Sequence, residues 1–198
     1  MQTQYDELQL DALRELASIG SGTAATALSK LLGRTVELTV PRSLALPLAD
    51  AVDAVGAAEE AVASVVLPVV GDVEAAVLLL FSEDCAATLC GLLAVEPGSE
   101  LGDSALGEIG NILGASAIGA LATLTGLALE PQPPHVVHDM LGAVVASVLA
   151  GTAGELEVAL VLDAELAVEG TACALSFLLL PTAGGVAELL DRLGVGSR

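Results

Sequence analysis

The chain has 198 residues, and 26 acidic side chains against 6 basic ones give a formal net charge of −20. A charge this negative repels phosphate backbones, which excludes a protein that grips DNA or RNA through Lys and Arg. Hydrophobic residues make up 54% of the chain and its mean hydropathy is +0.78, so the composition is that of a folded protein and excludes a disordered one.

The predicted elements follow the same order twice along the chain. In the first half we expect a long helix over 7–32 ending at Gly33, a short extended piece to Pro41, strands over 62–70 and 73–81 joined across Gly71 and Asp72, and a helix over 83–94. In the second half we expect a long helix over 101–125 ending at Gly126, an extended piece to Pro134, strands over 156–162 and 167–180 joined around 163–165, and a helix over 183–193. Consecutive hairpins predict an antiparallel sheet, and the apolar stripes of the helices must cover it, so the fold class is α+β.

This repeated order reflects an internal repeat in the sequence itself. Residues 11–41 align without gaps on residues 104–134, with eleven of 31 positions identical. The identical pairs include Glu15 with Glu108, Gly33 with Gly126, and Pro41 with Pro134. We therefore expect one domain over 1–198 with pseudo-two-fold symmetry, made of repeats over about 7–96 and 100–194 that are not stable apart.

The chain gives few indications of export, membrane insertion or bound metal. The first 13 residues contain Asp6, Glu7 and Asp11 instead of the basic and then apolar pattern of a signal peptide, so we expect a cytoplasmic protein. The uncharged run over 109–129 is long enough to span a bilayer, but its glycines and polar residues favour a buried helix over that alternative.

Metal-ligating residues are sparse. Three cysteines stand outside any C-x-x-C pair, and the two histidines have no partner at metal spacing. These residues are Cys85, Cys90, Cys173, His135 and His138. We expect buried thiols in a reducing compartment and no metal site.

The acidic composition also indicates the working environment. Lys30 is the only lysine, and Asp and Glu replace it on the surface. At about 1 M salt the Debye length is only ~3 Å, which screens repulsion among the carboxylates. We expect a halophilic protein of archaeal type; the alternative is an ordinary acidic protein, which would stay folded on dilution into low salt.

A polar stripe runs along the second long helix. Ser104, Glu108 and Asn111 stand at i, i+4 and i+7, which places them on one face of an otherwise apolar helix. The alternatives are a solvated face, or an N-cap made by Asp103 and Ser104. Small residues accompany the stripe at Gly107, Gly110 and Gly114. They would let a partner protein approach the polar side chains, or else they serve packing between the two halves.

These residues carry a resemblance to a known family. The pattern resembles the motif of the CheC, CheX and FliY family of chemotaxis phosphatases. In that motif, Asp or Ser is followed after three residues by Glu, after two more residues by Asn, and after twenty-two more by Pro. Ser104, Glu108, Asn111 and Pro134 match it in full, and Asp11, Glu15 and Pro41 match it with Ser18 in place of Asn. The resemblance is to the CheC branch and implies a continuous antiparallel sheet with two long signature helices side by side on one face.

The resemblance also implies a function. It implies a hydrolase that removes the phosphoryl group from the phosphoaspartate of the response regulator CheY. The receiver domain of CheY supplies Mg²⁺ and a lysine, so this chain needs no cofactor of its own. Asn111 would hold the attacking water, Glu108 would pair with the lysine of the receiver, and Ser104 and Pro134 would be structural. Because a Ser hydroxyl is shorter than an Asn amide, we expect the Glu15 and Ser18 site to be weak or inactive.

Two other functions remain open at this point. The chain would act as a non-catalytic adaptor if it only bound phosphorylated CheY or the receptor deamidase CheD. A flagellar-switch component is disfavoured because no extra domain or tail of the FliY or FliM type is seen.

Overall fold

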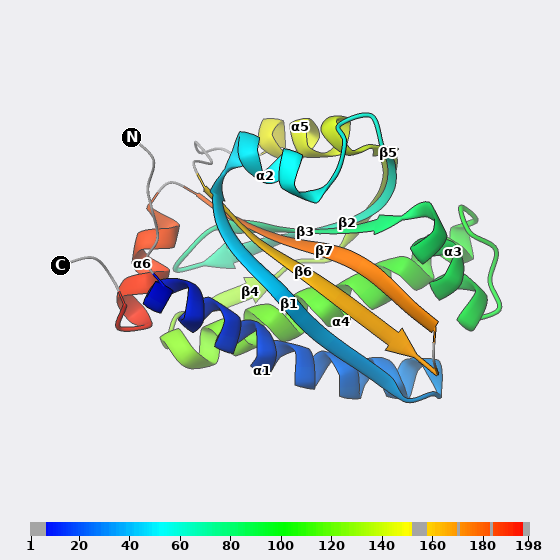
Figure 1. Ribbon diagram of the computed structural model, residues 1–198, viewed down its shortest axis with the longest axis horizontal. Helices are drawn as coiled ribbons and strands as arrows, with labels where there is room; N and C mark the ends of the chain where they lie inside the picture. The colour runs from blue at the N-terminus through cyan, green and yellow to red at the C-terminus, as the bar shows by residue number, and fades with distance from the viewer. Residues whose placement is uncertain (1–6, 152–157, 170, 183, 196–198) are drawn as a thin grey trace.

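The computed structural model describes residues 7–151, 158–169, 171–182 and 184–195, and in it helices cover both faces of one antiparallel sheet (Figure 1). The elements are, in chain order, α1 (Glu7–Leu32), β1 (Val36–Pro47), α2 (Leu48–Val55), β2 (Ala61–Gly71), β3 (Ala75–Ser82), α3 (Glu83–Leu92), α4 (Glu100–Thr125), β4 (Leu129–Pro131), β5 (His135–Met140), α5 (Leu141–Gly151), β6 (Val158–Val168), β7 (Thr171–Pro181) and α6 (Gly185–Arg192).

The two halves of the chain exchange strands within the sheet. The hydrogen-bonded order is β1-β6-β7-β3-β2-β4, and β5 also pairs with β2. The β2–β3 hairpin therefore receives its outer strands, β4 and β5, from the second half, while the β6–β7 hairpin receives β1 from the first half. The predicted α+β class with a continuous antiparallel sheet is confirmed, and the order of elements in the two halves is the one that a duplication would produce.

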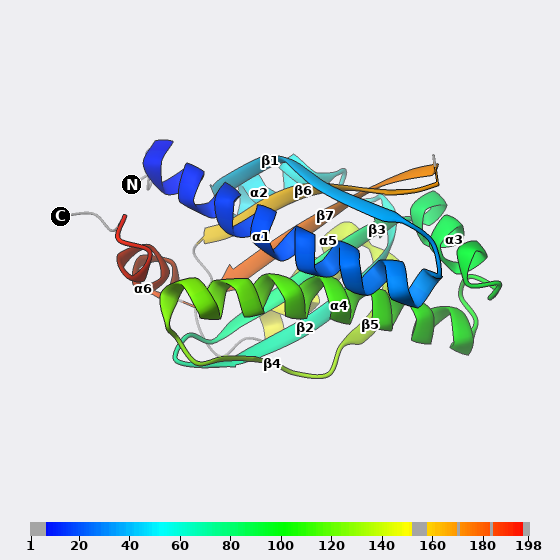
Figure 2. The same cartoon turned by 90° about the horizontal axis from the view of Figure 1, so that it is seen from below.

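The long helices α1 and α4 lie side by side and antiparallel on one face of the sheet, and both views of the ribbon show this arrangement (Figures 1 and 2). Alternate strand residues point to opposite faces: Leu79 and Phe81 belong to the core under α1 and α4, whereas Leu78 and Leu80 belong to the core under α5 and α2. The two helices come into close contact at Gly20 of α1, since a Cβ there would lie 3.1 Å from the Cα of Ala117 on α4.

The ends of these helices follow from their sequences. Gly33 and Gly126 adopt left-handed φ angles of +64° and +71°, which only glycine reaches without strain, and they end α1 and α4 as predicted. At the start of α4, the Oγ of Ser99 accepts a hydrogen bond of 3.1 Å from the backbone N–H of Gly102. Ser99 is therefore the N-cap, and the alternative that Asp103 and Ser104 form it is wrong.

The structure contains two short helices that the sequence did not predict, and β1 is longer than the predicted extended piece. β1 continues past Pro41 to Pro47, with a register shift between Thr39 and Arg42. An edge strand tolerates proline because the missing N–H faces outward at such a bulge. The helices α2 and α5 were not predicted: α5 is apolar throughout most of its length, and α2 has only eight residues, too few for its exposed Asp50 and Asp53 to establish a helical period.

The second hairpin turns later than predicted. Residues 163–165 lie inside β6, where Asp163 pairs with Arg42 on β1 through their side chains. The chain turns after β6 at Glu169, whose φ is +48°. Two predicted boundaries, the strand start at 156 and the helix start at 183, lie outside the described residues.

Helix α4 is the one helix in the described residues with the length and apolar composition of a membrane span. Half of its most apolar window, 50%, is buried inside the protein. It packs against α1 on one side and against β2 beneath it, as expected for a core helix.

Candidate functional site

Helix α4 has two different faces, and the inward one contains glycines among larger buried apolar residues. A Cβ on Gly110 would lie 2.6 Å from Cγ1 of Val65, and one on Gly114 would lie 2.9 Å from Cδ2 of Leu67, both on β2. These distances leave no room for a side chain, so glycine lets α4 lie directly on the strand. Of the two alternatives for these glycines, packing between the halves is the one that the structure shows for Gly110 and Gly114.

The outward stripe holds the predicted polar residues. Glu108 and Ser104 are exposed, and Asn111 is half-buried. The Ser104 Oγ donates a hydrogen bond of 2.8 Å to the carbonyl oxygen of Glu100, one turn earlier, so this side chain is engaged with its own helix. Glu108 and Asn111 remain as two candidate side chains one turn apart on the surface of a firmly packed helix.

Asn111 lies at one end of a groove of about 550 Å³ between α1 and α4. None of the residues that line this groove is charged: they are Ile19, Thr23, Ala27, Asn111, Ile112, Ala115, Ser116, Gly119, Ala120, Thr123 and Leu124. Lys30 is exposed on α1, three residues beyond Ala27. The groove therefore offers an amide, the hydroxyl residues Thr23, Ser116 and Thr123, and apolar surface to a ligand, and no carboxylate that would repel a phosphoryl group.

The corresponding residues of the first repeat occupy the other end of the helix pair. Asp11, Glu15 and Ser18 are all exposed on α1. Because α1 and α4 run antiparallel and cross at Gly20 and Ala117, a rise of 1.5 Å per residue places Ser18 about 12 Å from Asn111 along the helices. The structure thus does not bring the two sets of residues into one centre.

Neither motif proline lies in the groove: Pro41 is in β1, and Pro134 is in the connection between β4 and β5. Pro41 is exposed at the register shift of β1, and Pro134 is half-buried just before β5. In the second repeat, the prolines of the same region separate β4 from β5. Their structural role stays a prediction.

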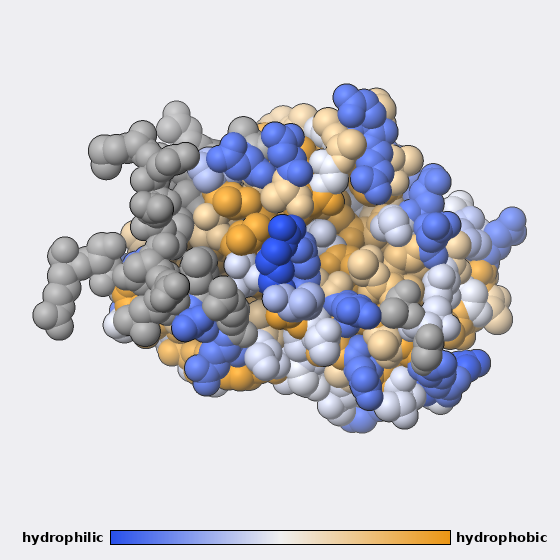
Figure 3. Space-filling model, viewed as in Figure 1, coloured by the Kyte–Doolittle hydropathy of each residue, from blue (hydrophilic) through white to orange (hydrophobic). Residues whose placement is uncertain are grey.

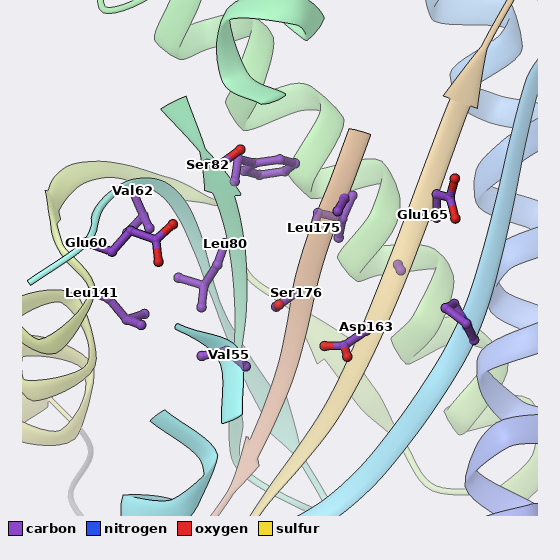
Figure 4. Close-up of a pocket in the computed structure, with 14 residues that line it drawn as sticks. Val55, Glu60, Val62, Leu80, Ser82, Leu141, Asp163, Glu165, Leu175 and Ser176 are labelled. Carbon is purple, nitrogen blue, oxygen red and sulfur yellow. The ribbon is translucent and has the colours of Figure 1, made fainter. Parts of the chain in front are cut away.

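A second hollow, of about 360 Å³, lies on the other face of the sheet (Figure 4). Three carboxylate residues, Glu60, Asp163 and Glu165, are among those that line it. On the face of the molecule that Figure 3 shows, hydrophilic side chains are spread around apolar surface. The carboxylates would repel a phosphoryl group, so the groove beside Asn111 is the better candidate site.

Histidine and cysteine side chains take structural positions. The Nε2 of His138 lies 2.7 Å from Oδ1 of Asp103, which ties β5 to the first turn of α4. The sequence spacing did not indicate this contact. Among the described residues, no group of three or more His, Cys, Asp or Glu could hold a metal ion.

The three thiols are buried, as predicted. Burial, and then the charge of Asp103, raises the pKa of Cys90. A hydrogen bond with Cys173 raises the pKa of Cys85 and lowers that of Cys173 to about 7.

Comparisons with known proteins identify the family. The model of the CheC-like family matches residues 8–44 and 101–138, the two segments that contain the repeated motif. The CheY-P phosphatase CheC of Bacillus subtilis (strain 168) is 36% identical over 168 residues, which cover 81% of this chain and 80% of that protein.

Among solved structures, FliY of Thermotoga maritima superposes with a TM-score of 0.75 at 20% identity, covering 97% of this chain and 98% of that one. The FliM middle domain from H. pylori superposes with a TM-score of 0.69 at 9% identity, covering 94% of this chain and 99% of that one. These two likenesses show the shared fold, and the sequence identity to the CheC of Bacillus subtilis shows the family. The chain belongs to the CheC-like family.

Proposed function

We propose that this protein is a hydrolase that removes the phosphoryl group from the phosphoaspartate of the chemotaxis response regulator CheY. The observation that carries the proposal is Asn111, a half-buried amide at the end of an uncharged groove, in a chain 36% identical to a CheY-P phosphatase. A phosphorylated receiver domain is the substrate, and the receiver with its aspartate side chain restored and inorganic phosphate are the products.

Asn111 positions the attacking water. In the reaction the water oxygen bonds to phosphorus while the bond from phosphorus to the aspartate oxygen breaks. The neutral amide of Asn111 both donates and accepts hydrogen bonds, so it holds the water in line without repelling the phosphoryl oxygens. The receiver brings its own Mg²⁺ and lysine to neutralise the developing charge, and this chain needs no cofactor.

Glu108 sets the register of docking. It is exposed one turn before Asn111 on the same face of α4, where it can reach a cation of the partner. Paired with the active-site lysine of the receiver, its carboxylate would direct α4 into the cleft that holds the phosphoaspartate. Ser104, bonded to its own helix, takes no part in the chemistry.

The first repeat keeps a carboxylate and loses the amide. Glu15 and Ser18 are exposed at the positions that correspond to Glu108 and Asn111. The Ser18 hydroxyl extends less far from the helix than an amide, so it does not reach a water in line with the phosphoryl group. This site is weak or inactive as a phosphatase.

The test follows the decay of phosphorylated receiver with Mg²⁺ in molar salt. Asn111→Ala should lower the acceleration about 100-fold, because a misplaced nucleophile alone costs that much. Ser18→Ala, the matched change in the other repeat, should leave the rate within about two-fold. Full activity in Asn111→Ala would refute the assignment.

A non-catalytic adaptor is the second candidate, favoured by the loss of the amide at Ser18. Such a protein would bind phosphorylated CheY, or CheD, without hydrolysis. Binding of phosphorylated receiver with an unchanged phosphate lifetime would support it. For either function we infer a cytoplasmic protein working at high salt, as the net charge of −20 and the single lysine support.

A further inference from the structure

We propose that the uncharged groove between α1 and α4 docks an apolar segment of the receiver beside its phosphoaspartate, and that Ile19 of the first repeat is its anchor. This inference rests on the proposed function and names the surface that would select the partner. It makes the helix of the inactive repeat part of the working site.

The groove differs from the rest of the surface in charge. The chain carries 26 acidic residues, yet no residue that lines the groove is charged. Exposed acidic side chains keep such a protein soluble. Because the groove has none, its apolar surface is exposed to water. The side chain of Ile19, 45% exposed, and that of Leu124, 44% exposed, are examples. A surface of this kind is favoured where a partner covers it.

The groove is continuous with the proposed site. Asn111 and Ile19 line the same hollow from opposite helices. With the helices crossing at Gly20 and Ala117, Ile19 lies about 10 Å from Asn111 along their axes and Leu124 about 20 Å. A standard interface buries about 800 Å² on each partner, a patch of about 16 Å radius. A receiver centred on Asn111 therefore covers Ile19 and leaves Leu124 at or beyond its edge.

The need to keep Asn111 open favours the receiver over a second copy of this chain. Two copies would each bring a net charge of −20 to the contact. They would also bury Asn111, which the proposed reaction needs to be open. A receiver that carries an apolar helix or loop next to its phosphorylation site fits the groove and leaves Asn111 facing the phosphoryl group.

The experiment compares three variants that each add one negative charge. Ile19→Glu should raise the KM for phosphorylated receiver at least five-fold with kcat unchanged, because about half of an isoleucine side chain loses its buried contact. Leu124→Glu should raise KM less. Val70→Glu, at a 40% exposed valine on β2 outside the groove, should change KM less than two-fold. Ile19→Ser separates lost apolar contact from added repulsion and should also raise KM.

Binding of receiver activated with beryllofluoride and Mg²⁺ gives a readout independent of hydrolysis. If the protein does not hydrolyse phosphoaspartate but Ile19→Glu still weakens this binding, the groove proposal stands and the proposed function fails. Hydrolysis with the same KM in Ile19→Glu and Val70→Glu overturns the groove proposal. A larger effect of Leu124→Glu than of Ile19→Glu, or self-association that Ile19→Glu abolishes, also overturns it. Circular dichroism and thermal unfolding check that each variant is folded.

Discussion

Two glycines of α4 should respond in opposite ways to the same substitution. A Cβ on Gly110 would lie 2.6 to 2.8 Å from Cγ1, Cβ and Cγ2 of Val65. Because the Cβ of Val65 is next to the backbone of β2, it cannot rotate away, and α4 must move outward. A Cβ on Gly119, in the same helix, would meet nothing within 4 Å.

The magnitudes follow from these distances. Overpacking at Gly110 costs about 1 to 3 kcal/mol, and the close contact with a branched carbon favours the upper value. Replacing a helical glycine by alanine returns about 1 kcal/mol. Gly110→Ala should therefore lower the free energy of unfolding by about 2 kcal/mol, whereas Gly119→Ala should raise it by about 1 kcal/mol.

The assay is reversible unfolding in urea, or thermal unfolding, in molar salt. For a chain of this size, 1 kcal/mol shifts Tm by roughly 2 to 4 °C, so the two variants should differ by about 6 °C or more. Val65→Ala combined with Gly110→Ala should cost less than the sum of the two single changes, since the new methyl group takes vacated space. Equal and stabilising shifts for Gly110→Ala and Gly119→Ala would refute the argument that α4 rests on Val65.

Three further outcomes are expected. Ser43→Ala should raise the free energy of unfolding by about 1 kcal/mol in urea titrations, since the Ser43 Oγ is buried without a hydrogen-bond partner among the described residues; a loss of stability would contradict this. Dilution from about 3 M to about 0.1 M salt should unfold the protein, as circular dichroism would record, because the net charge of −20 is then poorly screened; unchanged ellipticity would contradict halophily. The native thiols should resist a thiol reagent at pH 8 and react after unfolding, because all three are buried out of reach of the reagent, including Cys173, whose lowered pKa of about 7 would otherwise make it reactive; rapid labelling of the native protein would contradict the burial.

The long helices were predictable because their period and their ends are both encoded locally. A 3.6-residue repeat of apolar positions marks α1 and α4, and Gly33 and Gly126 end them with left-handed φ angles. The same period predicted that Ser104, Glu108 and Asn111 share one face of α4. In the structure this face lies outside the core. Local information was sufficient for these elements.

Features that depend on distant partners were not predictable. Residues 163–165 have the composition of a turn, but Asp163 pairs with Arg42 of the neighbouring edge strand and stays inside β6. The glycines of α4 have one spacing whether they face a partner protein or the sheet beneath, and only the position of Val65 decides between the two. The groove escaped prediction for the same reason, because Ile19 and Asn111 belong to helices whose relative position the sequence does not state.

The strand exchange explains why a repeat without the amide is retained. Helix α4 carries Asn111, yet it rests on β2, which belongs to the first half, and β1 of the first half completes the sheet beside β6. Substituting Ser for Asn at position 18 changes an exposed side chain and disturbs neither of these contacts. Removing the first repeat would take away the strand beneath Gly110 and one wall of the groove. On the proposed function, the site beside Asn111 therefore depends on the first repeat for support, whether or not Ser18 keeps any chemistry of its own.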